Sequence, residues 1–228
     1  MAKFHNEGTI RDFQKFNSEV YSMPDDRLYS LHDLLTQQQR FAMCALKGIR
    51  KGNKEKIKHN LLISLSFMTA KFNRLHVDIE DEVWKRFPNL CSYCGQKPCA
   101  CKKIKQPVRL KVKGHNKFKP KTLAGFQEMF NEIYPASTRT LADAGVHLAE
   151  EMGEVSEAIH NYLGQHKEKQ FDEVKLEIAD FISCVFGVAN SAEIDVANEL
   201  GKLFYNGCHV CHKTPCECSF TQIAKFKI

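Results

Sequence analysis

In the second half of the sequence, acidic residues recur at a spacing that places them on the same face of a helix. Glu151 and Glu154 are three residues apart, and so are Glu177 and Asp180 in the next helical pattern, so each pair shares one face of a helix. Glu151 also falls on an apolar position of its own helix, where a core side chain is expected. If the two helices pack antiparallel, the spacing predicts that four carboxylates converge in the interior.

Four buried carboxylates without compensation would be very costly. A hard divalent cation such as Mg²⁺ removes this cost, because it takes oxygen ligands and leaves positions for water and phosphate groups. The alternative is a solvated acidic face that pairs with the nearby lysines Lys167, Lys169 and Lys175.

Eight of the ten cysteines form two clusters with the same spacing, C-x2-C-x4-C-x-C. The first cluster is Cys91, Cys94, Cys99 and Cys101, and the second is Cys208, Cys211, Cys216 and Cys218. Four closely spaced thiolates form a tetrahedral set that suits Zn²⁺, so we expect two structural zinc ions. An iron–sulfur cluster is the alternative.

The sequence contains an internal repeat. The cysteine clusters are offset by 117 residues, and so are further identities upstream, such as Phe87 with Phe204. Earlier in the chain the offset is 113, as for Phe13 with Phe126. We therefore predict two homologous halves, residues 1–101 and 122–228, joined by residues 102–121.

The joining segment carries the excess positive charge of the chain. It holds nine Lys or Arg residues and no acidic residue, whereas the rest of the chain has 24 basic and 27 acidic residues. We interpret it as an extended surface connection, since it contains Pro107 and Pro120 and lacks a helical period. Nucleic-acid binding through this segment is an alternative that we do not favour, because Phe118 is its only aromatic residue.

Helical periodicity in both halves predicts an all-α fold of two tandem helical bundles, each with a cysteine knuckle at its C-terminal end. The longest apolar stretch, residues 61–70, is far shorter than the roughly 20 residues of a membrane span. No hydrophobic leader opens the sequence, so we expect a cytoplasmic protein without a membrane partner.

The segment LAEEMGEVSEAI followed by LEIADFI resembles the E-E-x-x-E…E-x-x-D signature of MazG-like all-α nucleoside triphosphate pyrophosphohydrolases, which include the dimeric dUTPases and dCTPases. The resemblance covers residues 122–206. It implies cleavage of a nucleoside triphosphate to the monophosphate and pyrophosphate, with Glu150 acting on the attacking water. The implied Mg²⁺ ligands are Glu151, Glu154, Glu177 and Asp180.

A K-x3-N element that often follows in this family matches Lys202 and Asn206, which would touch phosphate or sugar. The first half keeps the same element as Lys85 and Asn89, but it has no acid at the positions aligned with the five acidic residues of the signature. The positions aligned with the acids hold Gln37, Gln38, Phe41, Asn60 and Ile63.

Because the family commonly works as dimers, the resemblance implies an intramolecular pseudo-dimer with one live and one dead site. A homodimer of such pseudo-dimers stays open, and so does the nucleobase of the substrate. A nucleotide sensor without turnover is a further alternative function.

Overall fold

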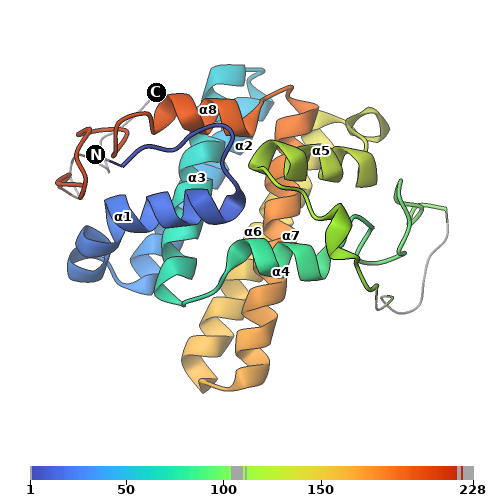
Figure 1. Cartoon of the computed structure of the whole chain (residues 1–228), viewed down its shortest axis with the longest axis horizontal. Coiled ribbons are helices and arrows are strands. Elements are labelled where there is room, and N and C mark those ends of the chain that lie inside the picture. Colours follow the sequence, from blue (N-terminus) through green and yellow to red (C-terminus); the bar gives the residue numbers. More distant parts are fainter. Residues whose placement is uncertain (1, 104–109, 111, 220–221, 223–228) are drawn as a thin grey trace. The chain divides into compact units, whose positions relative to one another are not determined.

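The chain folds into helices, most of which are joined by short connections, whereas the long segment of residues 87–122 separates α4 from α5 (Figure 1). The computed structural model describes residues 2–103, 110, 112–219 and 222. The helices are α1 (Ile10–Leu28), α2 (Leu31–Arg50), α3 (Lys54–Arg74), α4 (Ile79–Arg86), α5 (Leu123–Ile133), α6 (Leu141–Gln165), α7 (Glu168–Ser191) and α8 (Val196–Leu203). Two 3-10 turns, η1 (Asn116–Phe118) and η2 (Ala136–Thr138), complete the regular structure. The described residues contain no strand, which confirms the all-α prediction for them.

None of the helices in the described part of the chain combines the length and the apolar character needed to cross a membrane. Three of the long helices begin instead with polar capping boxes, in which a hydroxyl and a carboxylate satisfy the first free backbone groups. The pairs are Thr9 with Asp12, Ser30 with Asp33, and Thr140 with Asp143. Such a cap contributes about 1 kcal/mol. The last of them fixes where α6 begins, and therefore which side chains face its interior.

Contacts between residues divide the chain into two compact units. The first unit comprises residues 1–78 and 195–228, and the second comprises residues 79–194. Helix α4 belongs to the first sequence repeat but lies in the second unit, and α8 belongs to the second repeat but lies in the first unit. Each unit therefore combines helices from both repeats. The units divide the chain at different places from the predicted halves, which meet in the basic segment.

The first unit is built on the packed pair of α2 and α3, against which α1 and α8 lie. An aromatic cluster joins the start of the chain to the end of α8, because the Phe204 ring lies 5.7 Å from Phe13 and 5.3 Å from Phe16 between centroids. An ion pair of 3.0 Å between Lys58 and Glu199 links α3 to α8. Burial of these aromatic rings is the main stabilisation of this contact.

The second unit is built on the packed antiparallel pair of α6 and α7, to which α4 and α5 add (Figure 1). The Phe130 ring of α5 stands between two others, 5.1 Å from Phe87 and 5.5 Å from Phe186 between centroids. Phe87 follows α4, as Phe204 follows α8. The two identical phenylalanines thus perform the same packing role, each in the unit that contains the long helices of the other repeat.

The basic segment is partly anchored on α4. The Trp84 indole donates a hydrogen bond of 3.1 Å to Asn116 Oδ1, and Lys119 forms ion pairs of 3.1 Å with Glu80 and 3.0 Å with Asp81. The expected extended connection concerns residues 102–121, of which 104–109 and 111 lie outside the described residues. Its described C-terminal part is attached to the second unit through these side chains.

Lys71 is a buried lysine in α3. Its side chain is 0% exposed, and its Nζ has no hydrogen-bond partner among the described residues. Val188 holds the corresponding position of the other repeat. Burial lowers the pKa of Lys71 well below 10.5, so folding disfavours the charged form of this amine.

We expect Lys71→Met to stabilise the first unit by about 1–3 kcal/mol at pH 7, because it removes this cost while it keeps the side-chain volume. The gain should shrink as the pH rises toward 10.5, where the unfolded lysine also loses its proton. Urea unfolding followed by circular dichroism measures it. Lys54→Met, at the exposed start of α3, should change the stability by less than about 0.5 kcal/mol. A destabilised Lys71→Met protein would contradict this account.

Candidate functional site

Three of the predicted acidic ligands meet between α6 and α7. Glu151 comes from α6, and Glu177 and Asp180 come from α7. Each offers one carboxylate oxygen such that these oxygens all lie within 4.8 Å of one another. The antiparallel packing of the two helices brings the residues together, as their spacing predicted. We call these three residues the acidic triad.

The other two predicted acids lie at the margin of the acidic triad. Glu154 and Glu150 are exposed, and neither belongs to the set of oxygens within 4.8 Å. The charge of Glu154 nevertheless contributes to the raised pKa values of Glu151 and Glu177. Glu154 is therefore close enough to act with the triad, whereas Glu150 faces the solvent beside it.

Burial and mutual repulsion disfavour the ionised form of the carboxyl groups in the acidic triad. Burial, followed by the charges of Asp180, Glu154 and Glu177, raises the pKa of Glu151 to about 8. Burial and the charges of Asp180 and Glu154 raise the pKa of Glu177 to about 7. Burial also raises the pKa of Asp180, against the opposing effect of Arg86. Carboxylates perturbed in this way mark a candidate functional site.

Two oxygens of the acidic triad lack any hydrogen bond within the described part of the protein. Glu151 Oε2 and Glu177 Oε2 are both buried and unpartnered. Buried polar atoms are almost always satisfied in folded proteins, so such atoms call for a missing partner. A cation between the helices would satisfy both oxygens and would reverse the raised pKa values.

An arginine that the sequence analysis did not single out reaches the acidic triad. Arg86, the last residue of α4, bonds to both oxygens of Asp180: Nε lies 3.0 Å from Oδ1 and Nη2 lies 2.5 Å from Oδ2. The side chains are 13% and 8% exposed. The first repeat therefore does supply a residue to the site of the second, although not one of those predicted. The sequence contained a signal for this residue, because the second repeat has Leu203 at the position that corresponds to Arg86.

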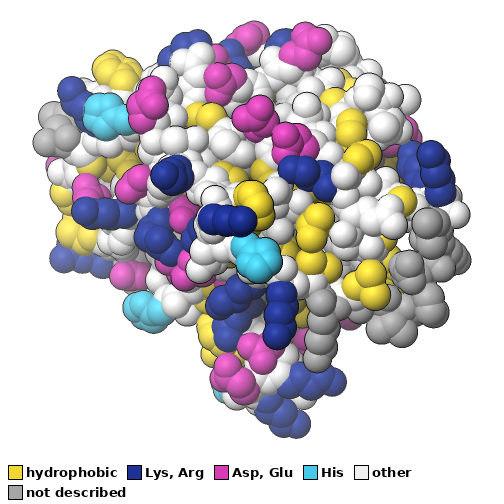
Figure 2. Space-filling view, turned by 45° about the vertical axis from the view of Figure 1, so that its right-hand side comes forward, with side chains coloured by type: hydrophobic (Ala, Val, Ile, Leu, Met, Phe, Trp, Pro, Cys, Tyr) yellow, Lys and Arg dark blue, Asp and Glu magenta, His cyan; other side chains and the backbone are white. Residues whose placement is uncertain are grey.

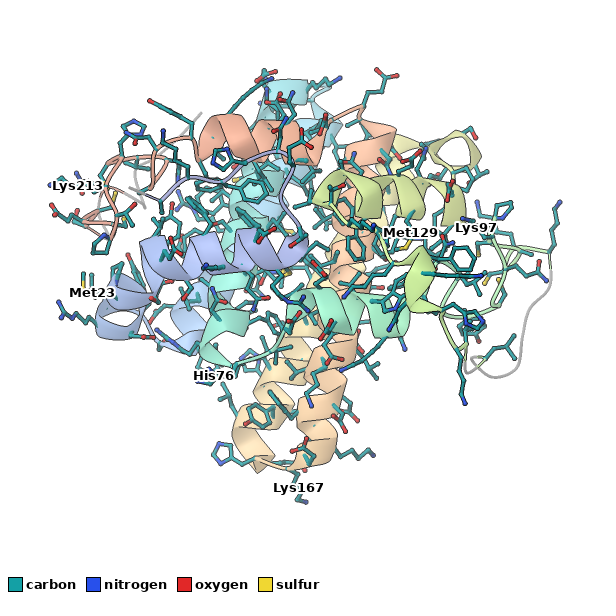
Figure 3. The ribbon with its side chains drawn as sticks, in the orientation of Figure 1. Met23, His76, Lys97, Met129, Lys167 and Lys213 are labelled. Atoms are coloured by element: carbon teal, nitrogen blue, oxygen red, sulfur yellow. The ribbon has the colours of Figure 1, made fainter. Side chains whose placement is uncertain are left out.

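The residues expected to contact substrate are engaged elsewhere. In the second unit, Lys85 forms an ion pair of 2.7 Å with Glu82, and Asn89 accepts a hydrogen bond of 2.9 Å from Lys97, which Figure 3 labels. Lys202 and Asn206 belong to the first unit, where Lys202 forms an ion pair of 2.6 Å with Glu199. Within the described part of the second unit, the ion pair of Lys85 and the hydrogen bond of Asn89 thus lead away from the acidic triad.

Arg139 lies beneath α7 rather than in the acidic triad. Its Nη2 donates a hydrogen bond of 3.0 Å to the Tyr134 carbonyl, and its guanidinium lies flat against Gly187, where an added Cβ would come within 3.1 Å. The glycine at position 187 therefore allows the arginine to pack directly on the helix backbone. This contact fixes α7 against η2, which precedes the acidic helix α6.

The corresponding positions of the first unit have no acid. Gln38, the counterpart of Glu151, is 0% exposed, and both atoms of its amide lack a partner among the described residues. Asn60 and Ile63, the counterparts of Glu177 and Asp180, are 6% and 1% exposed. A neutral and partly apolar set of this kind does not supply the carboxylates that a hard cation needs. Among these equivalent positions of the described residues, only those of the second unit provide a carboxylate set.

Both cysteine clusters have the dimensions of a site for a single metal ion. In the first, the Sγ atoms lie 3.7 Å apart for Cys91 and Cys101 and 3.9 Å apart for Cys94 and Cys99. The second cluster has separations of 3.4 to 3.9 Å. A tetrahedron with Zn–S bonds of about 2.3 Å has edges of about 3.8 Å. The thiols therefore fit one zinc ion in each cluster, and several metal atoms between them would require a wider separation.

Each cluster is attached to a helix of the other repeat through equivalent residues. Cys99 N donates a hydrogen bond of 2.8 Å to Ile133 O at the end of α5. Cys216 N donates one of 2.8 Å to Val20 O in α1. Ile133 and Val20 are related by the offset of 113, as Cys216 and Cys99 are by that of 117. The exchange of C-terminal elements between the repeats therefore includes the clusters as well as α4 and α8.

A tyrosine supports each cluster. Tyr134 Oη donates to Cys91 Sγ at 3.4 Å, and Tyr21 Oη lies 3.3 Å from Nδ1 of His209, the residue after Cys208. Burial, followed by the charge of the cysteine, raises the pKa of both tyrosines, so each keeps its proton to donate. The tyrosines occupy equivalent repeat positions, which was visible in the sequence, but their contact with the cysteine clusters was not.

Comparison of the chain with protein-family models, with curated proteins and with solved structures finds no match.

Proposed function

We propose that this chain is a magnesium-dependent nucleoside triphosphate pyrophosphohydrolase of the MazG-like class. It would convert a ribo- or deoxyribonucleoside triphosphate to the monophosphate and pyrophosphate. The observation that carries the proposal is the convergence of Glu151, Glu177 and Asp180 between two antiparallel helices, with raised pKa values and two buried unpartnered oxygens. The active site would lie in the second unit.

The acidic triad suits Mg²⁺ on geometric grounds. With Mg–O distances of about 2.0–2.1 Å, adjacent oxygens of an octahedron lie about 3 Å apart and opposite ones about 4.2 Å. Oxygens that already lie within 4.8 Å of one another need only a small inward movement to reach these separations. Magnesium usually keeps several positions for water and for substrate phosphates. A polyphosphate is therefore the substrate chemistry that fits such a centre.

In this mechanism, Glu151, Glu177 and Asp180 would hold the ion, and Glu154 would add a fourth carboxylate from the exposed margin. Bound Mg²⁺ would supply positive charge to the phosphate oxygens and would make the attacking water more acidic. Glu150 orients that water and takes up its proton. The bond between the α- and β-phosphates breaks, and one water molecule is consumed for each pyrophosphate released.

The degenerate first half would complete this site within one chain, as a partner subunit does in dimeric relatives of the resembled family. The position of α4 in the unit that holds the acids supports this proposal, since Arg86 of the first repeat bonds to Asp180. Lys85 and Asn89 lie in the same unit and stay candidates for substrate contacts once a nucleotide is bound. We further propose that each cysteine cluster holds one structural Zn²⁺.

The test is pyrophosphate release from a panel of ribo- and deoxyribonucleoside triphosphates with Mg²⁺. We expect turnover by the wild-type protein and a loss of about 100-fold or more in Glu177→Gln, because a metal ligand is removed. Glu157→Gln is the matched control, since Glu157 is exposed one turn beyond Glu154 on α6 and lies outside the acidic triad. Its activity should stay within twofold of the wild type.

Absence of turnover on every nucleotide, with folded and zinc-loaded protein, would overturn the proposed activity. Nucleotide binding in calorimetry without pyrophosphate release would then indicate a sensor. Binding to nucleic acid that weakens with salt and with substitution of the lysines in residues 102–121 would instead indicate a nucleic-acid-binding module.

A further inference from the structure

Arg86 occupies the place of a counter-ion in the acidic triad. Its guanidinium covers both oxygens of Asp180 in a two-point contact, which is the strongest arrangement for an arginine and a carboxylate. Its charge also opposes the rise in the pKa values of Glu151 and Glu177, so it acts on the whole triad. The Arg86 guanidinium thus occupies the Asp180 oxygens that would otherwise be available to a metal ion.

Comparison of the two repeats indicates that the arginine is present where the acidic residues are present. In the second unit, Arg86 of α4 stands opposite a helix that carries Asp180. In the first unit, the equivalent positions hold Leu203 and Ile63, both uncharged. Both residues of the pair are charged in one unit and apolar in the other. A residue needed only to shape the end of the short helix would have no reason to follow the charge of its partner in this way.

A divalent ion and a guanidinium repel each other when both lie against one carboxylate. The interaction of like charges a few ångströms apart is strong where burial lowers the dielectric constant, and Asp180 and Arg86 are both largely buried. Metal binding at the acidic triad must therefore loosen Arg86. A released and half-desolvated guanidinium then needs a new anion, and planar guanidinium groups bind phosphate oxygens well.

We propose that Arg86 is an exchangeable counter-ion which competes with the metal ion for Asp180 and then passes to a phosphate group of the substrate. This inference rests on the proposed function and deepens it. It makes Arg86 a residue that couples two ligands: the metal ion frees the arginine for the polyphosphate, and the polyphosphate removes the competitor of the metal ion. The two ligands therefore bind with positive cooperativity, and the coupling is the same in both directions.

The test is the binding of Mn²⁺ alone to the full, zinc-loaded chain, measured from the free Mn²⁺ signal in electron paramagnetic resonance. Arg86→Gln should bind Mn²⁺ about tenfold more tightly than the wild type, a factor within the usual range of such couplings. Arg86→Lys keeps the charge and should stay close to the wild type. A merely structural arginine would give weaker binding, or none, when it is replaced by glutamine.

Lys175→Gln is the matched control for charge. Lys175 lies on α7, as Asp180 does, but it pairs with Asp172 and Glu168 near the tip of the α6–α7 pair, where basic and acidic side chains intermingle (Figure 2). Its replacement lowers the net charge equally and should change Mn²⁺ affinity by less than twofold. Equal tightening in both variants would overturn the competition and indicate a general effect of net charge.

The coupling is measured by repeating the titrations with inorganic pyrophosphate, after protein-free titrations have given the share of Mn²⁺ that pyrophosphate binds in solution. Pyrophosphate should tighten Mn²⁺ binding about tenfold in the wild type and by less than threefold in Arg86→Gln. Equal tightening in both proteins would overturn the transfer of Arg86 to phosphate.

These outcomes are separable from those of the activity assay. Turnover by a wild-type protein whose Arg86→Gln variant binds Mn²⁺ no more tightly would overturn only the role of Arg86. Tighter Mn²⁺ binding by Arg86→Gln, in a protein that hydrolyses no nucleotide, would support the competition and overturn the enzymatic proposal.

Discussion

Glu151→Gln should make the metal-free protein more stable while it removes the proposed activity. The pKa of Glu151 is about 8 in the folded protein, against an ordinary value of 4.5. The folded state therefore favours the protonated carboxyl group. This contribution is fully present below pH 4.5 and is lost as the pH rises through about 8, because the unfolded chain releases its proton earlier. Glutamine, which does not ionise, escapes this loss.

The full shift would correspond to nearly 5 kcal/mol at 1.36 kcal/mol per pKa unit. Solvent screening and the coupling with the neighbouring acids reduce this value, so we expect Glu151→Gln to gain about 1–2 kcal/mol at pH 8. The difference from the wild type should grow between pH 4.5 and pH 8 and should be small at the lower limit.

Saturating Mg²⁺ should reverse the order of stability. An ion present at 100 times its dissociation constant stabilises the folded wild type by about 2.7 kcal/mol, whereas Glu151→Gln lacks one of the ligands. Urea unfolding can be followed through Trp84, the only tryptophan of the chain, which lies in the second unit, two residues before Arg86. The fluorescence therefore reports on the unit with the acidic triad. Glu157→Gln, with an exposed carboxylate, should show neither the gain nor the reversal.

A wild type that is the more stable protein at pH 8 without metal would contradict this prediction. Such a result would mean that the acidic triad is satisfied within the protein and has no need of a cation. The expected crossing, in contrast, is typical of a site whose binding groups reduce the stability of the unliganded fold.

The acidic triad was predictable because its signal is local. Glu151 interrupts an apolar helix face, and the i,i+3 pairs fix which side of each helix carries acid. Both facts follow from helix geometry alone, and the packed pair of α6 and α7 brings three of the carboxylates together. Glu154 was expected among them, but it is exposed at the margin of the acidic triad, although its spacing from Glu151 is the same as that of Asp180 from Glu177.

The exchange of elements between the repeats was not predictable, because the sequence is compatible with either arrangement. Phe87 and Phe204 are identical, as are Tyr21 and Tyr134. The C-terminal element of each repeat can therefore make the same packing contacts with the helices of its own repeat or with those of the other repeat. The choice depends on how each short connection, such as residues 75–78 between α3 and α4, directs the chain. Local patterns contain little information on such directions.

The role of Arg86 followed from that exchange and was hidden for the same reason. Within its own repeat, Arg86 belongs to the half without acids at the aligned site positions and lies at the end of a short helix. Only its placement in the second unit brings it to Asp180. Comparison of the two repeats position by position, with Leu203 as its counterpart, is the sequence signal that separates it from neighbouring cations.

Removal of either proposed zinc site should therefore damage the unit to which its cysteine cluster is attached, rather than the repeat to which the cluster belongs. The double substitution Cys91→Ser with Cys94→Ser disrupts the cluster that bonds to Ile133 of the second unit. Cys208→Ser with Cys211→Ser disrupts the one that bonds to Val20 of the first. Structural zinc contributes about 10–16 kcal/mol in zinc-finger peptides, which is as large as the total stability of about 5–15 kcal/mol of a typical domain.

We expect each double variant to lose one of two zinc equivalents in elemental analysis, and the melting temperature of the affected unit to fall by about 10 °C or more. In Cys91→Ser/Cys94→Ser the early transition should appear in Trp84 fluorescence, and pyrophosphate release should fall with it, because the tryptophan and the acidic triad share the second unit. In Cys208→Ser/Cys211→Ser the early transition should appear in circular dichroism but not in Trp84 fluorescence. The opposite assignment, with Trp84 sensitive to the second cluster alone, would contradict the exchange, since it would mean that each repeat closes on its own cysteines.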